Sequence, residues 1–146
     1  MPKSKKEKLL HLFNNVARIA QTFGMRLSFD DQDRATISLP YNPDLDHGLG
    51  CTHGGAIATL LDNAGWFTCA LAHRGDGWIA TSQLSLHLLL PAEKTDLRAR
   101  AEIIKSGKRQ DVAEMRCWDA NDNLVAHASG TFIYLENLPF EKLKES

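Results

Sequence analysis

The sequence predicts an α+β protein in which one long helix is covered by an antiparallel sheet. The first observation is an apolar stretch over residues 56–72. Apolar side chains recur in it at the three- and four-residue steps of a helix: Ile57, Leu60, Leu61, Ala64, Phe67 and Leu71. The second observation is a set of segments, before and after this helix, in which apolar and polar residues alternate as they do in half-buried strands.

The elements before the long helix are an amphipathic helix and a hairpin. Residues 3–8 form a basic, solvated start, and a membrane-surface role for these lysines is the less favoured alternative. Residues 9–23 then have helical spacing and predict one amphipathic helix packed on the domain surface. After Gly24 the period changes to two over residues 25–29 and 35–39, which predicts a hairpin with one buried face.

Four alternating segments follow the long helix, over residues 83–90, 97–103, 112–118 and 124–134. Turn-forming residues separate the last three, at 106–109 and 119–123. The pattern predicts a four-strand meander, so that the whole sheet wraps the helix. We expect three parts: an N-terminal helix over 1–23, the main domain over 24–137 and a C-terminal tail over 138–146.

Composition limits the classes of function. The chain has 146 residues, 43% of them hydrophobic, and a net charge of -1, which suits a single domain and offers no basic field for nucleic acid. No apolar run is long enough for a membrane span and no secretory signal is seen, so we expect a cytoplasmic protein. Three cysteines, Cys51, Cys69 and Cys117, lack metal or redox spacing and suit reduced thiols.

A glycine-rich loop leads into the long helix. Gly48, Gly50, Gly54 and Gly55 fall within eight residues, with His47 and His53 beside them, and Thr52 is a plausible N-cap. A helix N-terminus offers unpaired backbone N–H groups and a partial positive charge, and glycines let a ligand oxygen approach them. Gly54 and Gly55 therefore suggest an oxyanion hole, although a Gly-Gly pair can also simply turn the chain.

The long helix carries one acidic residue, Asp62. A carboxylate in such an apolar helix must have hydrogen-bond partners, be protonated or face a polar cavity, and it is either structural or catalytic. Asp62 follows Gly54 by eight residues, about 12 Å along a helix axis. The two groups can meet at one reacting atom only if they come from different subunits, which predicts a dimer with two shared sites.

These residues carry a resemblance to a known family. The hairpin, the glycine loop, His53-Gly54-Gly55 followed by Leu60, Asp62 and Ala64, and then Pro91-Ala92, resemble the hotdog-fold acyl-CoA thioesterases of the phenylacetyl-CoA thioesterase type. The likeness covers about residues 24–134. It implies a hotdog fold, in which a curved antiparallel sheet wraps a central helix, and assembly as a dimer or a dimer of dimers. It also implies hydrolysis of an acyl-CoA thioester to the free acid and coenzyme A.

The resemblance also implies roles for individual residues. Gly54, with Gly55 as a second candidate, would polarise the thioester carbonyl, and Asp62 of the partner subunit would activate water or attack the carbonyl. Thr81, or its neighbour Ser82, would position the water or the acid. His47 stands where many relatives have an asparagine, and an imidazole there should add pH dependence near neutrality. His53 is expected to organise the loop by hydrogen bonds, in preference to acting as the base.

The remaining expectations concern the ligand. Coenzyme A carries phosphates, so we expect a basic contact at the turn cluster Lys105, Lys108 and Arg109. Trp66 is expected to line the acyl tunnel or the dimer seam. No metal or redox cofactor is expected, because the loop histidines and Cys51 lack a fourth zinc ligand at typical spacing. Two rival functions remain: an enoyl-thioester hydratase of the same fold, and a non-catalytic acyl-CoA-binding protein.

Overall fold

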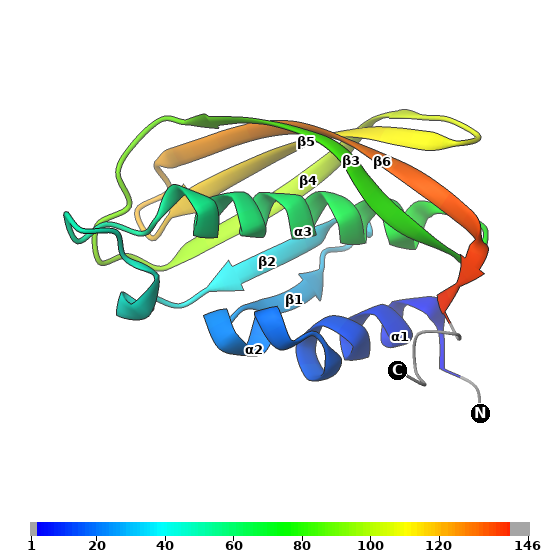
Figure 1. Cartoon of the computed structure of the whole chain (residues 1–146), viewed down its shortest axis with the longest axis horizontal. Coiled ribbons are helices and arrows are strands. Elements are labelled where there is room, and N and C mark those ends of the chain that lie inside the picture. Colours follow the sequence, from blue (N-terminus) through cyan, green and yellow to red (C-terminus); the bar gives the residue numbers. More distant parts are fainter. Residues whose placement is uncertain (1–2, 141–146) are drawn as a thin grey trace.

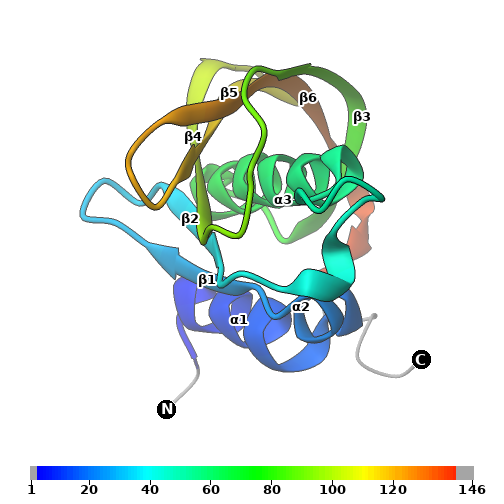
Figure 2. The same cartoon turned by 90° about the vertical axis from the view of Figure 1, so that its left-hand side faces the viewer.

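A computed structural model describes residues 3–140 and contains one curved antiparallel sheet around a long helix (Figures 1 and 2). This arrangement confirms the predicted α+β class. The helical elements are α1 (Lys5–His11), η1 (Leu12–Val16), α2 (Arg18–Phe23), η2 (Pro43–Leu45) and α3 (Gly54–Ala72). The strands are β1 (Arg26–Phe29), β2 (Ala35–Leu39), β3 (Gly77–Leu88), β4 (Leu97–Ser106), β5 (Gln110–Asp119) and β6 (Leu124–Pro139).

The order of the strands differs from the predicted meander. The sheet runs β1-β2-β4-β5-β6-β3, with every neighbouring pair antiparallel. Only β4, β5 and β6 form a meander. The edge of β4 that β3 would need is occupied by β2 from the hairpin, so β3 pairs with β6 instead. As a result β3, a strand of 12 residues, forms one edge of the sheet.

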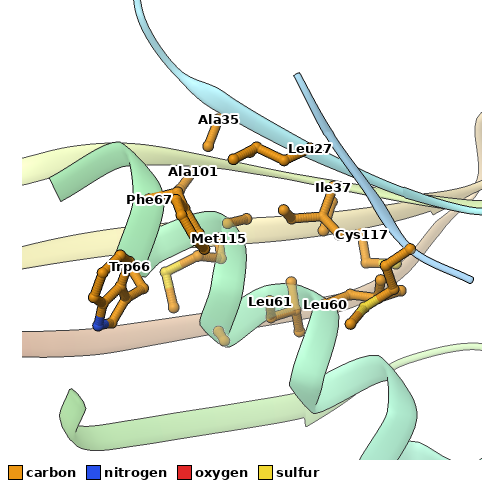
Figure 3. Packing of buried hydrophobic residues seen from close by; sticks show 14 of the residues in the cluster. Leu27, Ala35, Ile37, Leu60, Leu61, Trp66, Phe67, Ala101, Met115 and Cys117 are labelled. Atoms are coloured by element: carbon orange, nitrogen blue, oxygen red, sulfur yellow. The ribbon is translucent and has the colours of Figure 1, made fainter. Parts of the chain in front are cut away.

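Helix α3 lies in the concave face of the sheet (Figure 1), and its Leu61 and Phe67 belong to the same buried cluster as Met115 of β5 (Figure 3). Gly65 of this helix also faces buried side chains of β5 and β6. A Cβ atom added to Gly65 would lie 2.4 Å from Cζ of Phe132 and 3.0 Å from Sδ of Met115. Both neighbours are fully buried. The absence of a side chain at residue 65 therefore sets how deeply the helix sits in the sheet.

We expect the Gly65→Ala variant to lose about 1–3 kcal/mol of unfolding free energy, because the added methyl group overpacks the core. Urea denaturation of both proteins measures this difference. Gly48→Ala is the matched control, since Gly48 lies in the loop with no heavy atom within 4 Å of an added Cβ. Equal losses in the two variants would contradict the close packing at Gly65.

The N-terminal segment is not the single helix that its spacing predicts. It is divided into α1, a π-helical turn (η1) and α2, with extended backbone at Ala17 (φ -66°, ψ 113°). Leu9, Phe13 and Ala20 are buried, but Val16 and Ile19 are exposed, because the wider turn and the break rotate the apolar side chains apart. No helix within residues 3–140 is both long and apolar enough to cross a membrane.

The last strand continues beyond the predicted end of the main domain. β6 reaches Pro139, whereas the tail was expected to begin at residue 138. The rest of that expected tail, residues 141–146, lies outside the described residues.

Candidate active site

The N-terminus of α3 is capped by a histidine. Nδ1 of His53 accepts a hydrogen bond from the Gly55 N–H at 2.8 Å. The prediction of Thr52 as the N-cap is wrong: Thr52 is buried one residue earlier, where its N–H donates to the Ala92 carbonyl at 2.9 Å. The cap agrees with the expected loop-organising role of His53, and it occupies one of the two candidate oxyanion donors.

The other candidate donor is open. Within residues 3–140, no acceptor receives the Gly54 N–H, which is the first amide of α3. Gly54 lines a cavity of about 310 Å³ at the mouth of the helix. The other lining residues come from the glycine loop, the first turn of α3 and the end of β3 with its following link: His47, Cys51, Thr52, Ile57, Leu88, Leu89, Leu90, Pro91 and Ala92.

His47 lies in the same cavity as Gly54. Its Nδ1 accepts a hydrogen bond from the Leu49 N–H at 3.0 Å. By this bonding pattern the neutral ring carries its proton on Nε2, which leaves one donor for a ligand. Gly54 and His47 are therefore two polar groups that a carbonyl or a water molecule could meet together.

Asp62 lies midway along α3, where it is half-buried. Its Oδ1 accepts a hydrogen bond from the Thr81 hydroxyl of β3 at 2.6 Å. Burial raises the pKa of Asp62 above the ordinary value for a carboxyl group, and the Thr81 hydrogen bond opposes part of that rise. The Ser82 hydroxyl instead donates to the Thr131 carbonyl on the exposed side of the strand. Of the two candidate hydroxyls, Thr81 is thus the one at Asp62.

A second cavity, of about 330 Å³, contains Asp62. Trp66 also lines it, with its ring 4.8 Å from that of Trp78 and its Nε1 donating to the Ile79 carbonyl at 2.7 Å. Asp62 therefore has both features expected of a carboxylate in this helix, a hydrogen-bond partner and a cavity. The full lining is Phe13, Ala17, Asp62, Asn63, Trp66, Phe67, Trp78, Ile79, Ala80 and Thr81.

Phe13 and Ala17 are among the lining residues that sequence reasoning missed. The apolar spacing of residues 9–23 placed this segment on the domain surface, but nothing in the spacing indicated which cavity it would border. The segment reaches the Asp62 cavity because it packs beside α3, as the edge-on contact between the rings of Phe13 and Phe67 shows.

The two cavities have no lining residue in common. Since Gly54 and Asp62 are both on the straight helix α3, eight residues apart, one chain does not bring them to a single reacting atom. The expected basic cluster, Lys105, Lys108 and Arg109, is exposed at the β4–β5 turn and lines neither cavity. That turn lies at the end of the molecule opposite the start of α3 (Figure 1).

A curved antiparallel sheet closed around one long central helix, with a glycine loop at the start of that helix, defines the hotdog class of fold. A model of the thioesterase superfamily matches residues 49–126, more than half of the chain. The chain therefore belongs to the thioesterase superfamily, a family of hydrolases that act on thioesters. The resemblance noted in the sequence is confirmed.

Individual proteins show the same similarity. The PaaI protein of Escherichia coli, from the phenylacetic acid degradation operon, has the same fold, with a TM-score of 0.79 at 19% identity over 90% of this chain and 94% of that one. A Bacillus halodurans protein solved with CoA gives a TM-score of 0.78 at 25% identity over 92% and 96%. A Saccharolobus solfataricus protein, provisionally named an esterase, is 30% identical over 98 residues. That match spans 66% of this chain and 64% of the relative, so the chain covers slightly less than two thirds of the relative's length.

Proposed function

We propose that this protein is an acyl-CoA thioesterase whose active sites each combine Gly54 of one subunit with Asp62 of the partner subunit. The proposal is carried by one observation. The Gly54 N–H at the start of α3 has no acceptor within residues 3–140, and the half-buried Asp62 carboxylate lies on the same helix but too far away to act with it. Two such helices placed antiparallel across a two-fold axis bring each amide to the other chain's carboxylate. The CoA in the Bacillus halodurans relative supports coenzyme A as part of the ligand.

The edge strand β3 supports self-association. Its 12 residues offer a long edge for pairing with a second copy. Leu88, Leu89 and Leu90, which border the Gly54 cavity, are 54%, 50% and 49% exposed. Antiparallel pairing of two β3 edges would cover these leucines and place the two α3 helices side by side. Dimerisation would thus complete the site and remove an apolar surface from water.

The proposed hydrolysis centres on the Gly54 N–H of one subunit and the Asp62 carboxylate of the other. Attack on the thioester carbonyl produces a tetrahedral oxyanion, which the Gly54 N–H would stabilise. The Asp62 carboxylate accepts a proton from the attacking water, or bonds to the carbonyl carbon itself to give an anhydride that water then cleaves. In either route the carbon–sulfur bond breaks and the sulfur of coenzyme A leaves and takes up a proton. His47, which lines the cavity with Gly54, would hold the water or the carbonyl through its Nε2–H.

A steady-state panel of short, medium, long and aromatic acyl-CoAs, with thiol release as the readout, tests the proposal. Release of coenzyme A from at least one substrate is expected. No thiol release from any substrate would overturn it. In that case, loss of enoyl absorbance would identify a hydratase, and CoA binding without turnover would identify a non-catalytic binding protein.

Thr81→Val should move the acid limb of the pH–rate profile to higher pH. The Thr81 hydrogen bond lowers the pKa of Asp62, so its loss raises that pKa further. A base works only when deprotonated, and a higher pKa therefore requires a higher pH for the same activity. On the acid limb, kcat/KM should fall by up to about 10-fold, with a smaller loss at pH 8. Ser82→Ala, which removes the neighbouring hydroxyl, should leave the limb in place. An unmoved limb in Thr81→Val would contradict Asp62 as the titrating group.

A further inference from the structure

The N-terminal segment, residues 5–23, forms one wall of the cavity that contains Asp62. Phe13 comes from the π-helical turn η1, and Ala17 is the extended residue between η1 and α2. The Phe13 ring is buried and stands edge-on to Phe67 of α3, with 5.2 Å between the ring centroids. Two residues far from Asp62 in the sequence are therefore its neighbours across the cavity.

Hydrogen bonds hold this wall at its start and near its middle. Nζ of Lys5 donates to the carbonyls of His73 and Gly75, just beyond the end of α3. The Asn14 side chain bonds both the N–H and the carbonyl of Leu27 in β1, at 2.8 and 3.1 Å. After these ties, the Ala17 N–H completes the π turn by donating to the Leu12 carbonyl at 2.8 Å. The position of the wall is thus set by the fold of the domain.

The cavity has one polar side and one apolar floor. Asp62, Asn63 and Thr81 supply the polar side chains, and Nδ2 of Asn63 is already bonded to the Thr59 carbonyl. The floor is made by Phe13, Trp66, Phe67 and Ile79, all buried. A thioester has an apolar acyl arm and a polar, charged coenzyme A arm. With the carbonyl at Asp62, the apolar floor suits the acyl arm.

We propose that the N-terminal segment restricts the substrate to compact acyl groups, with Phe13 and Ala17 as the residues that set the accepted size. This inference rests on the proposed thioesterase function. The volume of about 330 Å³ is at the small end of ligand pockets, and Phe13 and Ala17 line the same cavity as Asp62, so they would border the acyl group of a bound thioester. We therefore expect acyl groups of a few carbons or a single ring to be accepted within this wall, and long straight chains to be disfavoured.

Two variants change the wall in opposite directions. Ala17→Leu adds bulk, and the backbone at Ala17 is compatible with any non-glycine residue. Phe13→Leu removes an aromatic ring from the floor and keeps an apolar side chain there. Thr22→Leu is the matched control: it adds a similar side chain to the same segment at an exposed position that does not line the cavity.

The experiment compares kcat/KM for acetyl-, butanoyl-, benzoyl- and dodecanoyl-CoA. In the wild type we expect a preference for the compact substrates over dodecanoyl-CoA. Ala17→Leu should lower kcat/KM for benzoyl-CoA by about 10-fold or more and leave acetyl-CoA nearly unchanged. Phe13→Leu should reduce the discrimination against dodecanoyl-CoA. A wild-type preference for dodecanoyl-CoA, or profiles for both variants that match Thr22→Leu, would overturn the inference.

Binding of S-alkyl coenzyme A thioethers, which cannot be hydrolysed, separates the two proposals. If the wild type releases no thiol, the thioesterase proposal fails. The size restriction is then judged by calorimetric affinities for S-ethyl- and S-dodecyl-coenzyme A in the same variants. Tighter binding of the short thioether by the wild type, with a smaller preference in Phe13→Leu than in Thr22→Leu, supports the restriction. Equal affinities for both thioethers, or no binding of either one, would reject it.

Discussion

Asp62→Asn is expected to lower kcat by about 10²- to 10⁴-fold while changing KM little. The amide has the same shape as the carboxylate and its oxygen can still accept the Thr81 hydroxyl, so the local packing is kept. It can neither take a proton from water nor attack the carbonyl. Rates of thiol release at saturating acyl-CoA measure the effect.

The matched control for this substitution is Asp44→Asn, at an exposed position in η2 that lines neither cavity. Its kcat should equal that of the wild type. Far-ultraviolet circular dichroism and thermal melts verify that both variants are folded. If Asp62→Asn kept a third or more of the wild-type kcat, neither route of Asp62 catalysis would be tenable.

Gly54→Pro is expected to lower kcat by about 10²- to 10³-fold, because it deletes the open N–H proposed for the oxyanion. Proline is well tolerated at the first position of a helix, and His53 before it has the extended backbone (φ -60°, ψ 138°) that a following proline requires. A Cβ at residue 54 would lie 2.6 Å from Cδ1 of Leu88, the end of a flexible side chain that can rotate away. The variant should therefore fold and lose only the amide donor.

Mixed dimers of these two variants test whether the site is shared. Asp62→Asn and Gly54→Pro chains, co-expressed with different tags and purified on both, should regain about half of the wild-type activity. In each mixed dimer one site combines an intact Gly54 with an intact Asp62, and the other site has neither. Each variant alone should be nearly inactive. Mixed dimers that stay inactive would place the two groups in separate reactions or within one chain.

The sequence predicted the fold well because its main signals are local and strong. The apolar stretch that became α3 is long enough to exclude a strand, and the hairpin and the last three strands alternate over many residues. Asp62 was conspicuous because a carboxylate is costly in an apolar helix. The structure supplies the Thr81 hydroxyl and the cavity that accompany it.

The errors arose where tertiary contacts decide between local alternatives. Thr52 has a side chain suited to an N-cap, but its backbone N–H is bonded to the Ala92 carbonyl in the segment after β3. The residue that caps α3 is His53 instead. Alternation identified the strand that follows α3 but did not reveal that β2 occupies its expected partner. The break at Ala17, which turns the N-terminal segment toward Asp62, has no proline or glycine to mark it.

The interval of eight residues between Gly54 and Asp62 has a consequence for how such a protein can diverge. In a symmetric pair with the proposed shared sites, every chain must keep both groups, since each would serve a different reaction centre. After gene duplication, however, two copies that always associate could each discard one group and retain a single working centre between them. A paralogue lacking Asp62 or an accessible amide at position 54 could therefore still be an obligatory half of an active enzyme.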